Sequence, residues 1–171
     1  MQLVMKRKFL ISGCLVAITF FIAYSVAKHV RFSGRVESVS SQAGNIYAIM
    51  SATQNAGGFP SESIFQNSTD YFRWLVSQEG GPVNYALFAA PGTPAYAGTN
   101  SAEFMARNNA WCVTTGISPK SPGDMPVLFT RNLSVESLAD TQNAVLSDIP
   151  PFGRRGAVVL FANGTVKFLK P

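Results

Sequence analysis

The residue types that commonly carry catalysis are few in this chain and lie far apart. His29 is the only histidine, so no Ser-His-Asp or Cys-His arrangement can form from the residues beyond it. Cys14 and Cys112 provide neither a disulfide framework nor the spacing of a zinc site. The nine acidic residues are scattered without a calcium-loop pattern, and no glycine-rich string fits a phosphate or dinucleotide loop. We therefore expect no catalytic residue, metal or cofactor, although the fold could still bring a carboxylate pair or a Ser/Lys pair together.

Two other features could take part in binding or reaction but have simpler interpretations. Cys112 stands beside Trp111 with no basic neighbour. We expect it to be a small buried apolar residue, because an activated thiol needs an adjacent base or cation. The pair Arg154-Arg155 is expected to lie in a solvated turn. A contact for an acidic partner is the alternative for that pair.

The net charge of +5 is set by the N-terminal region. Eight of the 14 basic residues lie beyond residue 35 and face nine acidic residues, so that part of the chain is almost neutral. Without a basic stripe there, we expect no nucleic-acid partner. The other six basic residues flank one apolar run and suit lipid headgroups: Lys6, Arg7, Lys8, Lys28, Arg31 and Arg35.

The apolar run covers residues 9–27 and would extend roughly 28 Å as a helix, close to the hydrocarbon thickness of a bilayer. A cleaved signal peptide fits its basic start, but the run is longer than usual for one. A lipid-modified Cys14 fits the string ISGC at residues 11–14, but most of the apolar sequence follows the cysteine. We favour a retained single-pass anchor with residues 1–8 in the cytoplasm. Its membrane and assembly helix would use Phe9, Leu10, Leu15, Val16, Ile18, Phe20, Phe21 and Ile22.

Residues 28–58 are expected to form an amphipathic helical stem. Apolar side chains recur there at three- and four-residue steps, the period of one helical face. Gly57, Gly58 and Pro60 predict its end. One interpretation is a single rod over residues 6–56, and the other is a separate stem helix joined to the anchor at Ser33-Gly34. In both, the packing face is expected to comprise Val36, Val39, Ala43, Ile46, Met50 and Thr53.

Residues 59–171 are expected to form a small α+β head domain. The sequence predicts a helix from Ser68 to Gln78, capped by Asn67 or Ser68. It predicts an irregular loop over 82–100 and a short helix over 101–107. Strands of a small antiparallel sheet are predicted at 110–115, 126–131, 157–162 and 165–169.

The strongest β signal is the pair of apolar runs around Asn163-Gly164. This dipeptide suits a two-residue type I′ turn, which pairs Phe161 with Val166 and Val159 with Phe168. We expect these four side chains to share one face of the hairpin and to meet the core.

This order of elements resembles that of the type IV pilin-like and type II secretion pseudopilin-like proteins of bacteria. The string GNIYAIMSATQNAGGFP at residues 44–60 looks like the junction of stem and head in that group. The string VLFANGTVKFL at residues 159–169 is similar to its C-terminal LFADG-x-V-x-F-L hairpin. The resemblance spans most of the chain in layout and these two strings in detail.

The chain departs from that group at the processing site. The group has glycine followed by Phe or Met, with a glutamate at the fifth mature position. Here Cys14 follows Gly13, and Ile18 stands in the glutamate's place. The methylation motif is therefore absent, and the resemblance implies a divergent, uncleaved or minor relative.

The resemblance implies a non-enzymatic structural or minor component of a type II secretion or type IV pilus-like assembly. It implies an inner-membrane protein with its head in the periplasm or outside the cell. Its partners would be lipid and other pilin-like or secretion-system subunits, stacked on the anchor and the stem face. The alternative is an anchored extracytoplasmic module that binds a ligand between loops 82–100 and 116–125. An anchored hydrolase is disfavoured because no histidine follows His29.

Overall fold

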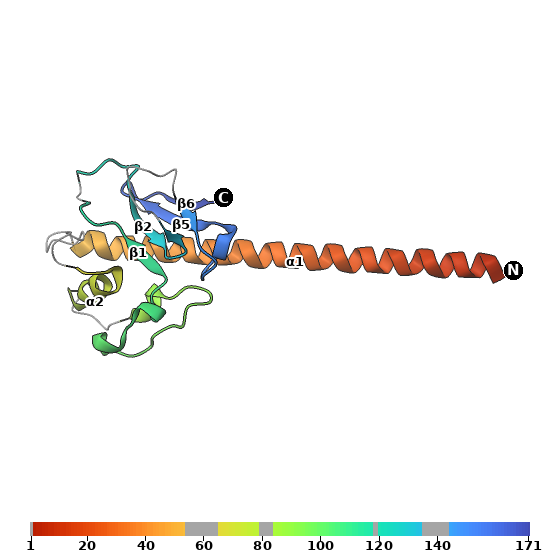
Figure 1. The fold of residues 1–171 in the computed structure, drawn as a ribbon, viewed down its shortest axis with the longest axis horizontal. Helices are drawn as coiled ribbons and strands as arrows, with labels where there is room; N and C mark the ends of the chain where they lie inside the picture. Colours follow the sequence, from red (N-terminus) through yellow and green to blue (C-terminus); the bar gives the residue numbers. More distant parts are fainter. Residues whose placement is uncertain (1, 54–64, 79–83, 118–119, 135–143) are drawn as a thin grey trace. The chain divides into compact units, whose positions relative to one another are not determined.

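The computed structural model of the chain describes residues 2–53, 65–78, 84–117, 120–134 and 144–171, with the backbone alone for residues 2–17. Its contacts divide it into two units, Met1–Glu37 and Ser38–Pro171. One helix, α1 (Gln2–Ala52), continues through both units (Figure 1). This agrees with the single-rod interpretation, and no break occurs at Ser33-Gly34. The predicted stop at Gly57-Gly58 lies outside the described residues.

The part of α1 that belongs to Ser38–Pro171 lies in the core of that unit. Its side chains at three- and four-residue spacing, Val39, Ala43, Ile46 and Met50, have no exposed area. The Tyr47 hydroxyl donates to the carbonyl of Ala162 at 2.7 Å, across 115 residues of chain. The predicted periodicity of the stem is confirmed over these positions, whereas Val36 lies in the other unit and is half-buried.

Helix α2 (Ser68–Gln78) has the predicted bounds. The Asn67 side chain accepts a hydrogen bond from the backbone amide of Asp70 at 3.0 Å, so Asn67 is the capping residue. The Ser68 hydroxyl does not cap the helix. It accepts a hydrogen bond from the amide of Val113 at 3.1 Å and so joins α2 to the sheet. The side of α2 that faces the core buries Tyr71, Phe72, Leu75 and Val76.

The main sheet has four antiparallel strands in the order β1-β2-β5-β6. They are β1 (Trp111–Val113), β2 (Pro126–Thr130), β5 (Ala157–Phe161) and β6 (Val166–Leu169). Each lies within a run predicted to be a strand. A second sheet pairs β3 (Leu133–Ser134) with β4 (Val145–Leu146), which the sequence did not predict. The structure is therefore α+β, as expected.

The predicted register of the C-terminal hairpin is wrong by one residue. Leu160 pairs with Val166 and Val158 with Phe168, while Val159 lies opposite Lys167. The loop has three residues, because the amide of Phe161 donates to the carbonyl of Thr165 at 2.9 Å. Gly164 has a φ of 80°, and no described non-glycine residue has positive φ, so Asn163 does not adopt the type I′ conformation.

As a result, the four side chains expected on one face of the hairpin lie on two. Val166 and Phe168 share a face with Leu160 and Val158. Val159 lies on the other face, in an apolar cluster with Ala157 and Leu133. Phe161, Phe129 and Leu146 pack against that cluster. Strand β5 is thus buried on both faces.

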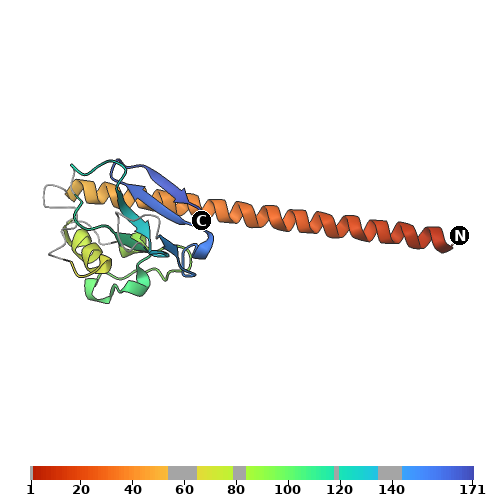
Figure 2. The same cartoon turned by 45° about the horizontal axis from the view of Figure 1, so that its top comes forward.

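A long segment connects α2 to the sheet, and its described residues, 84–110, form only short 3₁₀ turns between irregular stretches (Figure 2). These turns are η2 (Tyr85–Phe88), η3 (Ser101–Glu103) and η4 (Ala106–Asn108). The helix predicted over 101–107 is interrupted because Phe104 has extended backbone and a side chain with no exposed area. Its ring stacks on that of Tyr85, with centroids 4.7 Å apart.

Candidate interaction surfaces

The residues considered for chemistry do not converge. His29 is exposed on α1, in the unit Met1–Glu37, and Cys112 is in β1 of the other unit. Within the described part of the chain, no three His, Cys, Asp or Glu side chains gather as they would to hold a metal ion. The candidates that the described residues offer are three surfaces.

Cys112 is half-buried between α2 and Arg131. Burial raises the pKa of its thiol, and the opposing effects of the Ser68 side chain and the Arg131 charge are smaller. A raised pKa lowers the thiolate fraction near neutral pH, and the thiolate is the reactive form. This environment fits the predicted role of Cys112 as a small apolar residue in the packing.

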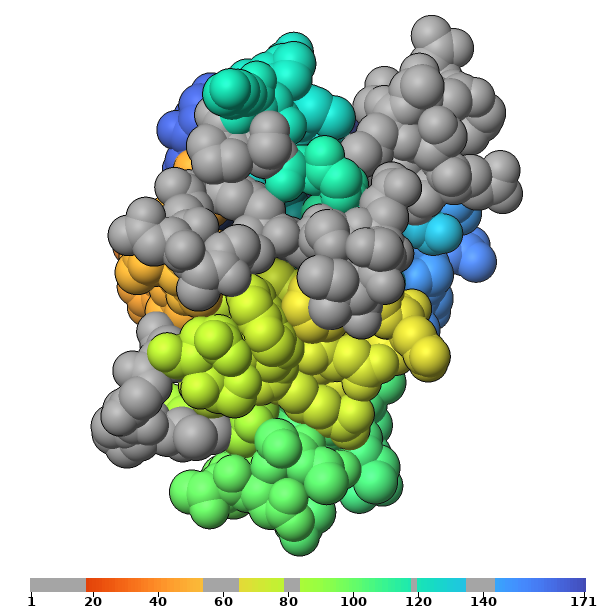
Figure 3. Space-filling view, turned by 90° about the vertical axis from the view of Figure 1, so that its left-hand side faces the viewer, coloured from red at the N-terminus to blue at the C-terminus, as the bar shows by residue number. Residues whose placement is uncertain are grey.

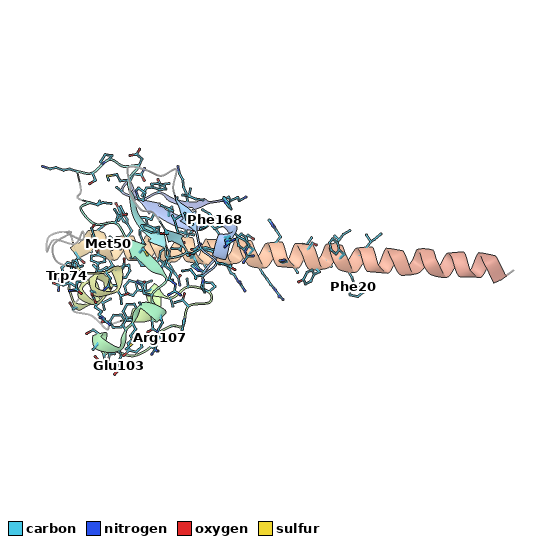
Figure 4. The ribbon with its side chains drawn as sticks, in the orientation of Figure 1. Phe20, Met50, Trp74, Glu103, Arg107 and Phe168 are labelled. Carbon is cyan, nitrogen blue, oxygen red and sulfur yellow. The ribbon has the colours of Figure 1, made fainter. Side chains whose placement is uncertain are left out.

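The first candidate surface is the apolar side-chain surface of α1 from Ile18 to Val30. Phe20 is 74% exposed and Phe21 73% exposed, and Figure 4 shows Phe20 projecting from the helix. Large apolar side chains that are exposed in series mark a surface that another apolar partner covers. The other large apolar side chains exposed on this part of α1 are Ile18, Ile22, Tyr24, Val26 and Val30.

Half of the predicted anchor carries no described side chains. Phe9, Leu10, Leu15 and Val16 fall in residues 2–17, where only the backbone is described. Ile18, Phe20, Phe21 and Ile22 are described and exposed. No helical stretch within the searched, described residues combines the length and apolar character needed to cross a membrane.

The stem face is not available to partner subunits over its buried part. Val39, Ile46 and Met50 belong to the stem face on which other subunits were expected to stack. All three have no exposed area within Ser38–Pro171, so their apolar surface is already used inside the unit. Subunit stacking along this part of α1 would have to use its other sides.

A second candidate surface is the irregular segment from Ala89 to Ala110, which two arginines fix in place. The Arg73 Nε of α2 donates to the carbonyl of Phe104 at 2.9 Å, and its Nη1 pairs with Asp70 at 2.9 Å. Arg131 approaches from the sheet, and its Nη1 donates to the carbonyls of Ala106 and Asn109 at 3.1 and 3.2 Å. Long ordered loops of this kind often carry binding sites.

The outer side of this segment carries small and polar side chains around one large exposed apolar residue. Met105 is 46% exposed, and Figure 4 places Glu103 and Arg107 on the outer side of the segment. In the face drawn in Figure 3, the segment lies directly beside α2. Sequence reasoning missed both arginines because their carbonyl partners lie 22 to 31 residues away.

A third candidate surface is the basic turn η6 (Gly153–Arg155), whose Arg154 and Arg155 side chains are exposed, as predicted. The turn is fixed by Asn132, which has no exposed area. The Asn132 Nδ2 donates to the carbonyls of Gly153 and Gly156, both at 2.8 Å. Sequence reasoning gave no signal for Asn132.

The two loops proposed to share a ligand do not come together. The described residues of 82–100 lie with α2, and those of 116–125 lie at the turn of the β5–β6 hairpin. The amide of Asn163 in that turn donates to the carbonyl of Gly123 at 3.0 Å. Figures 1 and 2 show the two loops on opposite sides of the unit Ser38–Pro171. The described residues of the two loops therefore do not line a common ligand site.

Comparisons of the chain with protein-family models, with curated proteins and with solved structures gave no match.

Proposed function

We propose that this chain is a non-enzymatic, pseudopilin-like envelope protein that serves as a structural or minor subunit of a type II secretion or type IV pilus-like assembly. The observation that supports this most is helix α1, a single helix from Gln2 to Ala52. Its upstream part exposes large apolar side chains, while its downstream part is the core of a small α+β unit. Such a helix suits a subunit whose anchor and head are one continuous element.

The exposed part of α1 needs an apolar environment. Covering one large apolar side chain contributes about 1.5–3 kcal/mol relative to leaving it in water. With seven such side chains exposed between Ile18 and Val30, a water-exposed helix would be prone to association. Membrane lipid and the helices of neighbouring subunits are the partners we assign to it, at the inner membrane.

Ile18 stands where the resembling group has a glutamate, and this difference indicates which kind of subunit the chain would be. The glutamate found there in the resembling group would leave an unpaired charge in an apolar helix bundle unless a neighbour neutralised it. Ile18 carries no charge and is 58% exposed. We therefore favour an uncleaved or minor subunit that joins the bundle by apolar packing alone.

Site-specific photocrosslinking in the native host tests the proposal. A photoreactive phenylalanine analogue is placed at Phe20 or Phe21 of the full chain, with the exposed position Lys120 in the head as a control. Illumination is expected to yield protein adducts from the helix positions, and mass spectrometry is expected to identify pilin-like or secretion-system subunits. If Phe20 and Phe21 form lipid adducts alone, the assembly role is wrong and an anchored module without subunit partners remains.

A further inference from the structure

Strand β1 lies at one edge of the main sheet, with β2 as its neighbour on the inner side. The Ala110 carbonyl and the Thr114 amide, at the two ends of β1, are hydrogen-bonded to the chain of β2 at 2.9 and 3.0 Å. In an antiparallel ladder, every second residue bonds to one neighbour, and the residues between them direct their backbone groups to the other side. Trp111 and Val113 therefore direct their amides and carbonyls away from β2, along the outer edge of the sheet.

The side chain of Asn109 binds both outward groups of Trp111. Its Oδ1 accepts from the Trp111 amide at 2.9 Å, and its Nδ2 donates to the Trp111 carbonyl at 2.9 Å. The Nδ2 also donates to the Thr69 hydroxyl at 3.3 Å, so these partners fix the orientation of the carboxamide. A residue of a neighbouring antiparallel strand would offer the same pair of bonds to Trp111. The Asn109 carboxamide, in a residue only 4% exposed, thus takes the place of a strand.

Ser68 occupies the next position along the same edge. Its Oγ accepts from the Val113 amide at 3.1 Å, and it is the first residue of α2, which packs against β1. Together, the side chains of Asn109 and Ser68 bond three of the four outward backbone groups of Trp111 and Val113. Unbonded backbone groups along a sheet edge form a template for a strand of another chain. At β1, side chains of the same chain already occupy that template.

We propose that Asn109 and Ser68 form a strand mimic that prevents β1 from pairing with β1 of a second copy of this chain. A second copy is the partner to be excluded because the pairing is self-complementary. In two antiparallel β1 strands, Trp111 of each copy would exchange both backbone hydrogen bonds with Val113 of the other, around a twofold axis. Cys112 of one copy would lie opposite Cys112 of the other, with Cα atoms about 4.5 Å apart. This inference does not depend on the membrane or on the partners proposed for α1.

Hydrogen exchange of single backbone amides, followed by NMR on the full chain in mild detergent, measures how each position of the edge is closed. Asn109→Ala is expected to speed exchange at the Trp111 amide by about fivefold or more, because that amide loses its hydrogen bond. Ser68→Ala is expected to have the same effect at the Val113 amide. The control Asn132→Leu removes two hydrogen bonds to η6. It is expected to leave the ratio of the two exchange rates unchanged.

Cys112 reports on the pairing of two copies when Cys14 is replaced by serine. Two cysteines with Cα atoms about 4.5 Å apart are within the range of a disulfide. With copper phenanthroline as oxidant, Ser68→Ala/Asn109→Ala is expected to give about fivefold or more Cys112-linked dimer than the parent chain. Adding Cys112→Ala to this double variant is expected to abolish the dimer. Asn132→Leu, which is destabilised at another place, is expected to give no more dimer than the parent chain.

Tryptophan fluorescence establishes first that each variant is folded. Faster exchange at the matching amide, together with dimers linked through Cys112, supports the inference. It is overturned if the folded double variant gives no more dimer than the parent chain, or if Asn132→Leu gives as much dimer as the double variant. If the double variant does not fold, Ser68→Ala decides in the same two assays, because it removes a single hydroxyl from a half-buried residue.

Discussion

Replacing Ile46 with alanine tests whether the stem of α1 belongs to the core of the head. Ile46 has no exposed area in the unit Ser38–Pro171. Ile22 lies on the same helix, 56% exposed, in the other unit. The two substitutions remove the same atoms from two environments, so Ile22→Ala is a matched control.

The expected cost follows from the atoms removed. The substitution deletes three side-chain carbons, which at about 0.8 kcal/mol each amounts to about 2.4 kcal/mol of lost burial. The cavity left in a closely packed site raises this to about 3–4 kcal/mol. Alanine's better helix propensity returns about 0.4 kcal/mol. We therefore expect Ile46→Ala to lower the free energy of unfolding by about 3 kcal/mol, and Ile22→Ala to change it by less than about 0.5 kcal/mol.

Urea unfolding in mild detergent, followed by tryptophan fluorescence, measures the difference. Both tryptophans, Trp74 and Trp111, lie in Ser38–Pro171, so the signal reports on this unit alone. With an m-value of about 2 kcal/mol per molar, the midpoint for Ile46→Ala is expected to fall by about 1.5 M. A loss below about 1 kcal/mol for Ile46→Ala, or equal losses at the two sites, would refute the assignment of the stem to the core.

Three further outcomes are expected. Asn132→Leu removes both hydrogen bonds to Gly153 and Gly156 and should lower the free energy of unfolding by about 2–4 kcal/mol in the same urea assay. The control, Asn163→Ala at an exposed position, should lower it by less than about 1 kcal/mol. Equal losses in the two variants would contradict the role of Asn132. Arg73→Met releases the carbonyl of Phe104 and should speed tryptic cleavage after Arg107 by about fivefold or more. Asp70→Asn removes only a half-exposed ion pair and should have a smaller effect on the cleavage rate. An unchanged cleavage rate for Arg73→Met would show that the segment is fixed by other contacts. Alkylation of Cys112 by iodoacetamide at pH 8, followed on its peptide by mass spectrometry, should be at least about tenfold slower in the folded protein than in urea, because burial raises the thiol pKa. Equal alkylation rates would contradict the burial. The same raised pKa means that the free energy of unfolding should decrease as the pH rises above the thiol's unfolded pKa of about 8.5.

Elements defined by local sequence could be predicted well. The bounds of α2 follow from the Asn67 cap and a short amphipathic pattern, both of which act within a few residues. The buried positions of α1 follow from helical periodicity, because a single side of that helix enters the core. Neither prediction depends on how distant parts of the chain meet.

The hairpin register could not be fixed in the same way. Asn163-Gly164 is compatible with a two-residue turn and with a three-residue loop whose last glycine has positive φ. Alternation between apolar and polar residues would normally choose between them. Strand β5 is buried on both faces, so its sequence is apolar throughout and either register looked acceptable.

The contacts that fix the candidate surfaces are long-range and leave no local signature. Arg73 reaches a carbonyl 31 residues away, and Asn132 reaches carbonyls 21 and 24 residues away. Their acceptors are backbone groups, which every residue type offers. The two-residue strands β3 and β4 are also too short to show a period.

The hydrogen bond between Tyr47 and Ala162 has a consequence for biosynthesis. The helical segment that fills the core leaves the ribosome 115 residues before the turn it bonds to. At 5–20 residues per second, the apolar side of residues 39–50 waits roughly 6–23 s for the strands that cover it. During that interval it is open to chaperones and to wrong partners, so the head is expected to fold only late in synthesis, as one unit.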